Sequence, residues 1–230
     1  MIIGNGMIAN AFSFLEKDNS VLIFASGVSN SCETSSVAFG KEKKLLINAI
    51  NKHLDKIIVY FSTCSIFDQG MQNSAYTNHK IKMENLIKSK SANYIIFRLP
   101  QVIGRGGNKS NLINYLYDRI NSFVPISIWS DAYRDIIDIE DVVKIVMFTL
   151  KDKCIATEIN IGSNKPTKVL DIVNIIENLI DKKAIISIIE KESYANGFDI
   201  SKMQQISKKI NIDFNNNYTE KVIGKYYDKK

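Results

Sequence analysis

Tyr76 and Lys80 stand four positions apart, and they follow a hydroxyl pair, Ser62 and Thr63, that ends the apolar run "IIVYF". At this spacing the tyrosine and the lysine leave one face of a helix. A free tyrosine has a pKa of about 10, and a nearby ammonium favours the phenolate and lowers that pKa. Such a tyrosine can give a proton to an oxygen atom as a hydride reaches the adjoining carbon, or remove it in reverse. We predict that Thr63, Tyr76 and Lys80 meet around one reacting carbon.

The first residues, "MIIGNGMIANAFSFLEK", indicate a loop that binds phosphate. Gly4-Asn5-Gly6-Met7-Ile8-Ala9 has the spacing G-x-G-x-x-A between a very short strand and a helix. Gly4 would permit the tight turn, Gly6 would let a phosphate approach the backbone, and Ala9 would let helix and strand pack closely. The free N–H groups of the helix would then bind a pyrophosphate. A structural turn without a ligand is the alternative.

Alternating strands and helices would position these residues. The segments "VLIFASG", "KIIVYFST" and "YIIFRLP" are short and nearly continuous in apolar residues, as in strands buried on both faces of a parallel sheet. Residues 38–52 and 76–88 between them have helical patterns. This alternation predicts an α/β fold with a Rossmann-like, doubly wound parallel sheet.

A smaller α/β region is predicted after Pro100. It begins with the Gly-rich loop "QVIGRGGNKS", and its strands are "PISIWSD" and "AIISIIE". Carboxylates in "DIEDVVKIVMFTLKD" precede a further helix. We assign residues 1–100, joined by about 135–163, to a cofactor domain. Residues 101–134 and 164–230 would form a smaller substrate-binding region.

The composition narrows the class of protein. The chain has 230 residues, of which 45% are hydrophobic and 23% charged, as in ordinary globular proteins. The net charge of +6 comes from scattered lysines without a basic block, so we expect no nucleic-acid partner, although a mild positive field favours an anionic ligand. No signal peptide and no apolar run near 18 residues is present, which predicts a cytoplasmic protein without a membrane partner.

Metal binding and disulfides are not expected. The three cysteines, Cys32, Cys64 and Cys154, are far apart, and the chain has only two histidines. We expect Cys64 to be a small buried filler. His79 lies about 60° from Lys80 around the predicted helix, and we expect a surface side chain there.

In this order the motifs resemble the extended short-chain dehydrogenase/reductases, a group of nucleotide-sugar epimerases, dehydratases and 4-keto reductases. "FASGVSNS" is similar to the family's "HLAAxS", "FSTCSIFD" to "SSxxVYG", and "YTNHK" to "YxxxK". "IFRLPQVIGRGG" is similar to "LRxxNVYGPG", and "YRDIIDIEDVV" to "RDyIhVdDva". "NIGSNKPTKVLDIV" and "FDISKMQQI" match "NvGsgxxxSvxEl" and "DxsKaxxxLG". The resemblance covers nearly the whole chain.

The resemblance implies the following site residues. The catalytic set would be Thr63, Tyr76 and Lys80, with Lys80 on the nicotinamide ribose of NAD or NADP. Residues implied in cofactor binding are Gly4, Asn5, Gly6, Met7, Ile8, Ala25, Ser26, Gly27, Ser62, Tyr76, Lys80, Leu99 and Val102. Residues implied in substrate binding are Thr63, Ser65, Arg105 and Arg134, with Arg134 on the substrate diphosphate. The resemblance also implies a homodimer that pairs through the helices at 38–52 and 76–88.

The chain departs from the family near its start. Only 22 residues separate Gly4 from Ser26, where family members place two more strands and a helix that bind adenosine. We therefore expect the sheet to begin at its first strand, with an open edge. A right-handed crossover would then move the first helix to the opposite face. A displaced helix, an exceptional hand and a rearrangement at a dimer contact stay open.

The expected function is NAD(P)H-dependent reduction of a 4-keto nucleotide sugar, in deoxysugar synthesis for surface polysaccharide. Cys64 and Ser65 stand where dehydratases of the family carry an Asp-Glu pair, so we do not expect 4,6-dehydration. One alternative is an epimerase with the same three residues, although it must retain NAD without the adenosine elements. The other alternative is a non-catalytic remnant that binds or scaffolds, which the complete catalytic set opposes.

Overall fold

A computed structural model describes residues 1–109, 111–163, 165–191 and 197–228. Its main sheet has the order β1-β2-β3-β4-β9, and every pair of neighbours is parallel. The strands are β1 (Ile2–Ile3), β2 (Val21–Phe24), β3 (Ile57–Thr63), β4 (Tyr94–Leu99) and β9 (Thr157–Asn160). This confirms the predicted parallel sheet. Among the described residues β1 pairs only with β2, so the sheet begins at β1 with an open edge, as expected.

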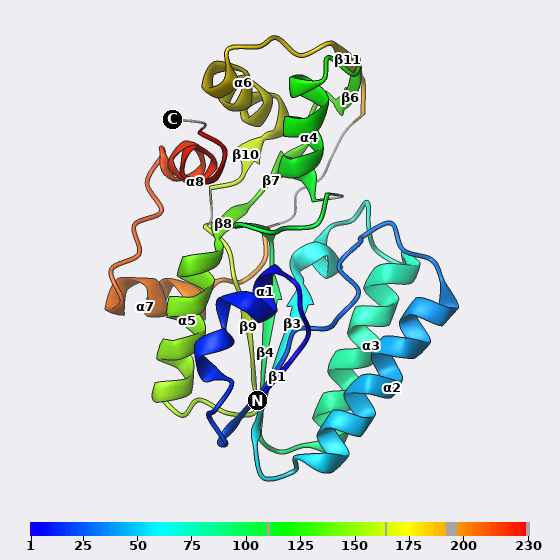
Figure 1. The fold of residues 1–230 in the computed structure, drawn as a ribbon, viewed down its shortest axis with the longest axis vertical. Helices are drawn as coiled ribbons and strands as arrows, with labels where there is room; N and C mark the ends of the chain where they lie inside the picture. Colours follow the sequence, from blue (N-terminus) through cyan, green and yellow to red (C-terminus); the bar gives the residue numbers. More distant parts are fainter. Residues whose placement is uncertain (110, 164, 192–196, 229–230) are drawn as a thin grey trace.

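Helices cover both faces of this sheet (Figure 1). Successive strand residues point to opposite faces, and the strands are apolar on both. One face packs against α2 (Ser36–Lys52) and α3 (Ala75–Lys90), with Leu46, Ile50 and Ile87 fully buried. The other face packs against α1 (Met7–Ala11), the short helix η1 (Ser13–Leu15), α5 (Ile139–Lys151) and α7 (Ser201–Lys209).

The connection from β1 to β2 has the opposite hand to the next two. The chain moves in one direction across the sheet from β1 to β4, but α1 lies on the α5 face while α2 and α3 lie on the other. The sequence left three arrangements of the first crossover open, and the structure has the one in which the crossover from β1 to β2 has the exceptional hand. Phe12 supplies the physical reason, because it is fully buried and stacks on Phe61 of that face, with ring centroids 5.6 Å apart.

A smaller part of the molecule has its own apolar core. It contains α4 (Leu112–Asn121), α6 (Val169–Ile180) and α8 (Tyr218–Tyr227). Three strand pairs accompany them: β6 (Ile126–Trp129) with β11 (Ile186–Ile189), β7 (Tyr133–Arg134) with β10 (Thr167–Lys168), and β5 (Gln101–Ile103) with β8 (Ile136–Asp138). The predicted strands "PISIWSD" and "AIISIIE" are present as β6 and β11. The domain boundaries stay a prediction, and Met203 of α7 packs with the main sheet.

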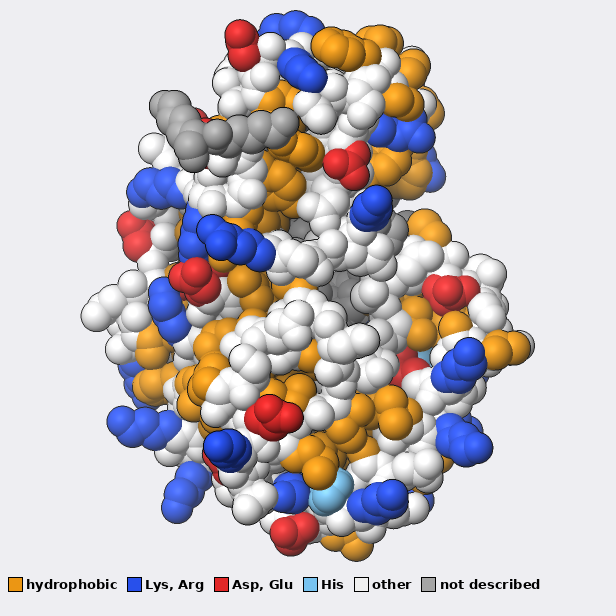
Figure 2. Space-filling view, in the orientation of Figure 1, with side chains coloured by type: hydrophobic (Ala, Val, Ile, Leu, Met, Phe, Trp, Pro, Cys, Tyr) orange, Lys and Arg blue, Asp and Glu red, His pale blue; other side chains and the backbone are white. Residues whose placement is uncertain are grey.

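Side chains of α8 fix the start of α5, next to the segment that carries Arg134. Asp138 caps α5 through the Glu140 N–H, as the carboxylates there predicted. The Tyr226 hydroxyl and the Lys225 ammonium donate to Asp138 at 2.6 and 2.8 Å. No described helix is long and apolar enough to span a bilayer. Lysine and arginine side chains are spread over the face in Figure 2, which is hollowed between the two parts of the molecule.

Candidate active site

The predicted motifs meet at the carboxyl edge of the sheet, where open α/β sheets bind ligands. Gly4 follows β1 in a left-handed conformation with φ +135°, and a Cβ there would lie 2.4 Å from the Ala25 carbonyl oxygen. A Cβ on Gly27, after β2, would lie 2.6 Å from Lys80 Nζ. The phosphate loop, the end of β2 and the lysine are therefore neighbours. A side chain at Gly4 would meet backbone atoms of Ala25, and one at Gly27 would displace the side-chain ends of Lys80 and Glu42.

Tyr76 lies in the first turn of α3, which Ser74 caps by accepting from the Thr77 N–H. Its side chain is buried beside Thr63, whose hydroxyl donates to Ser65 Oγ at 3.0 Å. Burial raises the pKa of Tyr76 to about 12, the neighbouring Thr63 hydroxyl opposes this shift, and the charge of Glu42 adds to it. The structure thus brings the predicted tyrosine and threonine together, with the tyrosine held in its protonated form.

Lys80 is completely buried and does not lower the pKa of Tyr76. Its Nζ donates to Glu42 Oε1 at 3.3 Å and to the Tyr60 hydroxyl at 3.2 Å, and it lies 6.0 Å from the Tyr76 ring centroid. Burial lowers the pKa of Lys80, and Glu42 opposes that shift. The expectation that Lys80 lowers the pKa of Tyr76 is wrong for this structure, because Glu42 neutralises the ammonium.

Glu42 of α2 is the main residue that the sequence analysis missed. Its carboxylate accepts from the Val28 N–H at 2.7 Å, the Tyr60 hydroxyl at 2.7 Å and His79 Nε2 at 2.9 Å, besides Lys80. Burial raises the pKa of Glu42, but these donors outweigh it and bring the pKa to about 2. The carboxylate is therefore ionised at neutral pH.

His79 is buried, so the expected surface position is wrong. Its ring stacks on Phe39 with centroids 4.4 Å apart, and its Nε2 lies against Glu42. Cys64 is buried as expected, and its Sγ contacts the Arg98 carbonyl oxygen at 3.2 Å. Burial raises the pKa of the Cys64 thiol well above its usual range, which removes it as a nucleophile.

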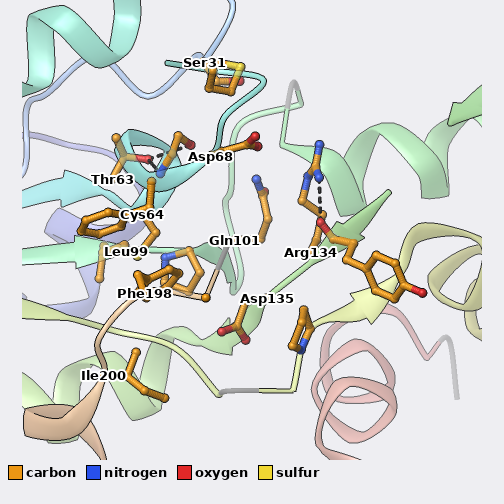
Figure 3. Close-up of a pocket in the computed structure, with 17 residues that line it drawn as sticks. Ser31, Thr63, Cys64, Asp68, Leu99, Gln101, Arg134, Asp135, Phe198 and Ile200 are labelled. Carbon is orange, nitrogen blue, oxygen red and sulfur yellow. Dashed lines mark hydrogen bonds between the residues drawn. The ribbon is translucent and has the colours of Figure 1, made fainter. Parts of the chain in front are cut away.

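A cavity of about 230 Å³ opens beside this edge, between β3, β4 and the smaller part of the molecule (Figure 3). Four residues predicted for the site line it, namely Thr63, Ser65, Leu99 and Arg134. Residues that the sequence analysis missed also line it, among them Ser31, Asp68, Gln101, Asp135 and Phe198. Figure 3 shows Arg134 and Gln101 across the cavity from Thr63 and Leu99. The described residues that line the cavity therefore offer one cation, two carboxylates and several neutral polar groups, together with apolar side chains.

Other predicted residues lie outside this cavity. Arg105 is exposed and does not line it. Val102 is buried in the core beneath the sheet. Met7 reaches toward the Gly-rich loop, because its Sδ lies 2.9 Å from where a Cβ on Gly104 would stand. Ile8 packs against the same core, and Asn5 is exposed.

Ser62 has a buried side chain whose Oγ has no hydrogen-bond partner among the described residues. A buried hydroxyl without a hydrogen-bond partner destabilises the folded protein, and a ligand that hydrogen-bonds to it removes that cost. Ser62 ends β3 beside Thr63, so it is a candidate to hold a cofactor. Across the described residues, no cluster of three or more His, Cys, Asp or Glu side chains could hold a metal ion.

Comparisons with known proteins agree with this geometry. A model of the NAD dependent epimerase/dehydratase family matches residues 40–162. No curated protein matches the chain in a sequence search. The UDP-glucuronic acid 4-epimerase of Bacillus cereus, solved with UDP-glucuronic acid and NAD, has a TM-score of 0.70 and 18% identity, over 95% of this chain and 77% of that one.

Two further solved structures share the fold. The dTDP-glucose 4,6-dehydratase of Bacillus anthracis, in complex with NAD, has a TM-score of 0.66 and 14% identity, over 91% of this chain and 73% of that one. A dTDP-4-dehydrorhamnose reductase of Clostridium acetobutylicum has a TM-score of 0.62 and 18% identity, over 80% and 70%. The predicted Rossmann-like α/β fold is confirmed.

Proposed function

We propose, because the chain belongs to the NAD-dependent epimerase/dehydratase family, that it is an oxidoreductase that reduces the 4-keto group of a nucleotide-linked sugar with NADH or NADPH. The product would be a deoxysugar nucleotide of the kind used for surface polysaccharide. The cavity beside Thr63 would hold the sugar, with Tyr76 as the proton donor.

The open edge of the sheet at β1 carries this choice. An epimerase must keep its NAD bound while the sugar is transiently oxidised, whereas a reductase exchanges its cofactor in every turnover. The described residues form no strand beyond β1 that could bind adenosine, and weak cofactor binding is compatible with a reductase. Reduction of a ketone also needs a proton donor at the carbonyl oxygen, and Tyr76 carries its proton at neutral pH because burial raises its pKa.

The residues present fit the nicotinamide end of NAD or NADP. Ser62 has a buried Oγ without a described partner, and the space that a Cβ on Gly6 would enter is open to 4 Å. Lys80 keeps one ammonium donor beyond Glu42 and Tyr60. When bound, the reduced cofactor supplies a hydride to the ketone carbon and is left oxidised. The described residues form no strand beyond β1 that could bind the adenosine of the cofactor.

The positions of Thr63 and Tyr76 indicate what each side chain would do in the reaction. Thr63 would hydrogen-bond the ketone oxygen and fix it near Tyr76. Tyr76 would give its hydroxyl proton to that oxygen as the carbon–oxygen double bond becomes single. The resulting phenolate would take a proton back from water after the alcohol leaves. The apolar lining at Leu99 and Phe198 limits access of water to the carbonyl.

Arg134 would bind the diphosphate of the substrate. It lines the cavity, and no described carboxylate forms an ion pair with it, although its Nη1 donates to the Tyr133 carbonyl oxygen at 2.7 Å. The Bacillus cereus epimerase with this fold was solved with a UDP-sugar. We expect Arg134→Ala to weaken the binding of UDP or dTDP by about 10- to 100-fold, as for the loss of a charged hydrogen bond. Calorimetry measures this, and Arg119→Ala is the matched control because Arg119 lies on α4 and does not line the cavity. Equal losses in both variants would contradict the assignment.

A non-catalytic binding role is the second candidate, because the part of the chain that the structure describes adds no strand beyond β1 that could bind adenosine. NADH and NADPH titrations followed by fluorescence, on wild type and Lys80→Met, separate the two. The reductase predicts micromolar binding that Lys80→Met weakens, and cofactor oxidation with UDP- or dTDP-linked 4-keto sugars. Absence of binding up to millimolar cofactor, with and without UDP, would favour the binding role.

A homodimer through α2 and α3 remains part of the proposal. Val37, Leu45 and Ile81 are large apolar side chains that stand exposed on these two helices. Sedimentation of wild type and of Leu45→Glu measures whether this face joins two copies.

A further inference from the structure

The ammonium of Lys80 is enclosed by three elements of the fold. Lys80 itself comes from α3, Glu42 from α2 and Tyr60 from β3. An ammonium has three donors, and among the described residues only Glu42 and Tyr60 accept from it. One donor therefore remains, and the backbone of Gly27 passes close to this ammonium.

We propose that Glu42 is a positioning residue, which keeps Lys80 charged and directs its third donor toward the ribose hydroxyls of the cofactor. The inference rests on the proposed function, because Lys80 acts there on NADH or NADPH. Glu42 itself would touch neither the cofactor nor the substrate.

The hydrogen bonds of Glu42 explain how it can position Lys80. Its Oε1 accepts from Tyr60 and Lys80, and its Oε2 accepts from the Val28 N–H and from His79. These donors come from the segment after β2, from β3 and from α3. The carboxylate thus fixes the distance between the end of β2 and the helix that carries Tyr76. A purely apolar residue on α2 would leave Lys80 as an unpaired charge in the interior.

No other described carboxylate serves Lys80 in the same way. Glu84 also lies on α3 and is equally buried, but both its oxygens pair with Arg98, at 3.0 and 2.6 Å. Tyr60 and Tyr76 face Lys80 as neutral groups, because burial raises the pKa of both. Without Glu42, only the charge of Glu84 would oppose the effect of burial on the pKa of Lys80, so the balance would shift toward the neutral amine.

The test is the pH dependence of cofactor affinity. NADH fluorescence titrations between pH 6 and pH 9 would compare wild type with Glu42→Gln. We expect Glu42→Gln to bind at least about tenfold more weakly at neutral pH. A lysine with a lowered pKa loses its proton at lower pH, so the affinity of Glu42→Gln should fall at a lower pH than that of wild type. Glu84→Gln, which also removes a buried charge from this layer, should shift the pH profile less than Glu42→Gln does, because Glu84 acts on Lys80 through its charge without a hydrogen bond to it.

A second measurement needs no cofactor. The side-chain nitrogen of Lys80, in protein labelled with ¹⁵N-lysine and assigned with Lys80→Met, reports by NMR whether it is an ammonium or an amine. We expect an ammonium in wild type at pH 7 and a loss of its proton at lower pH in Glu42→Gln. An identical titration in both proteins would overturn the inference.

The outcomes separate the inference from the function. If wild type binds NADH and Glu42→Gln binds it equally at every pH, the inference fails and the function stands. If wild type binds neither cofactor, the function fails, and the role of Glu42 toward the cofactor fails with it. If Glu42→Gln does not fold, Glu42→Asp is used in its place. This variant keeps the negative charge but moves it away from Lys80 by one methylene. We expect Glu42→Asp to bind NADH more weakly than wild type with the wild-type pH profile, and wild-type affinity in Glu42→Asp would overturn the inference.

Discussion

Replacement of Tyr76 by phenylalanine is expected to slow ketone reduction by about 10²- to 10⁴-fold, the usual effect of removing a proton donor. The phenylalanine ring fills the same buried volume, so the fold and the cavity should persist. The lost hydroxyl is the group that lies beside Thr63 and whose pKa is raised by burial to about 12. NADH binding should stay near wild type, because Lys80 keeps Glu42 and Tyr60 as partners. The rate constant for NADH oxidation with a 4-keto sugar nucleotide measures the effect.

Tyr94→Phe is the matched control for this prediction. Tyr94 begins β4, at the amino end of the sheet and away from the cavity. Its rate constant should equal that of wild type. A Tyr76→Phe rate within threefold of the control would mean that another group protonates the ketone oxygen, and the catalytic assignment would then fail.

That Tyr76 lies beside Thr63 and near Lys80 was predictable, because each of these residues has a fixed place in a regular element. A strand end and two positions of one helix give directions that local periodicity sets. The partner of Lys80 was harder to predict, because α2 is remote in sequence. One signal was present: Glu42, Leu46, Ala49 and Ile50 share the buried face of α2, at spacings of four, seven and eight residues. A carboxylate in such a stripe requires a buried donor, which could be sought on the neighbouring helix.

The hand of the first crossover and the cavity lining could not be predicted from local patterns. Burial of Phe12 decides the hand, and periodicity alone does not say which face of the sheet a side chain will cover. Gln101, Asp135 and Phe198 reach the cavity from segments far apart in the chain. Their convergence depends on how the smaller part of the molecule packs on the sheet, which is a tertiary property.

Alanine substitutions at Gly4 and Gly6, the two glycines of the predicted phosphate loop, are expected to differ in their effect on stability. Gly4→Ala should lower the free energy of unfolding by about 2 to 5 kcal/mol, because its φ is +135° and its Cβ would meet backbone atoms of Ala25 at 2.4 and 2.7 Å. Gly6→Ala should change stability by less than about 0.5 kcal/mol, because no atom lies within 4 Å of its Cβ. Chemical denaturation measures both values.

The Gly4→Ala and Gly6→Ala variants also distinguish an effect on stability from an effect on cofactor binding at this loop. A Cβ on Gly6 would enter the space through which a pyrophosphate approaches the backbone, so Gly6→Ala should weaken NADH binding by about tenfold or more. Because its fold is unchanged, that loss would belong to the ligand contact alone. Wild-type NADH affinity in Gly6→Ala would mean that the pyrophosphate does not lie on this loop. Gly4 would then be a turn residue that serves only the packing of β1 on the end of β2.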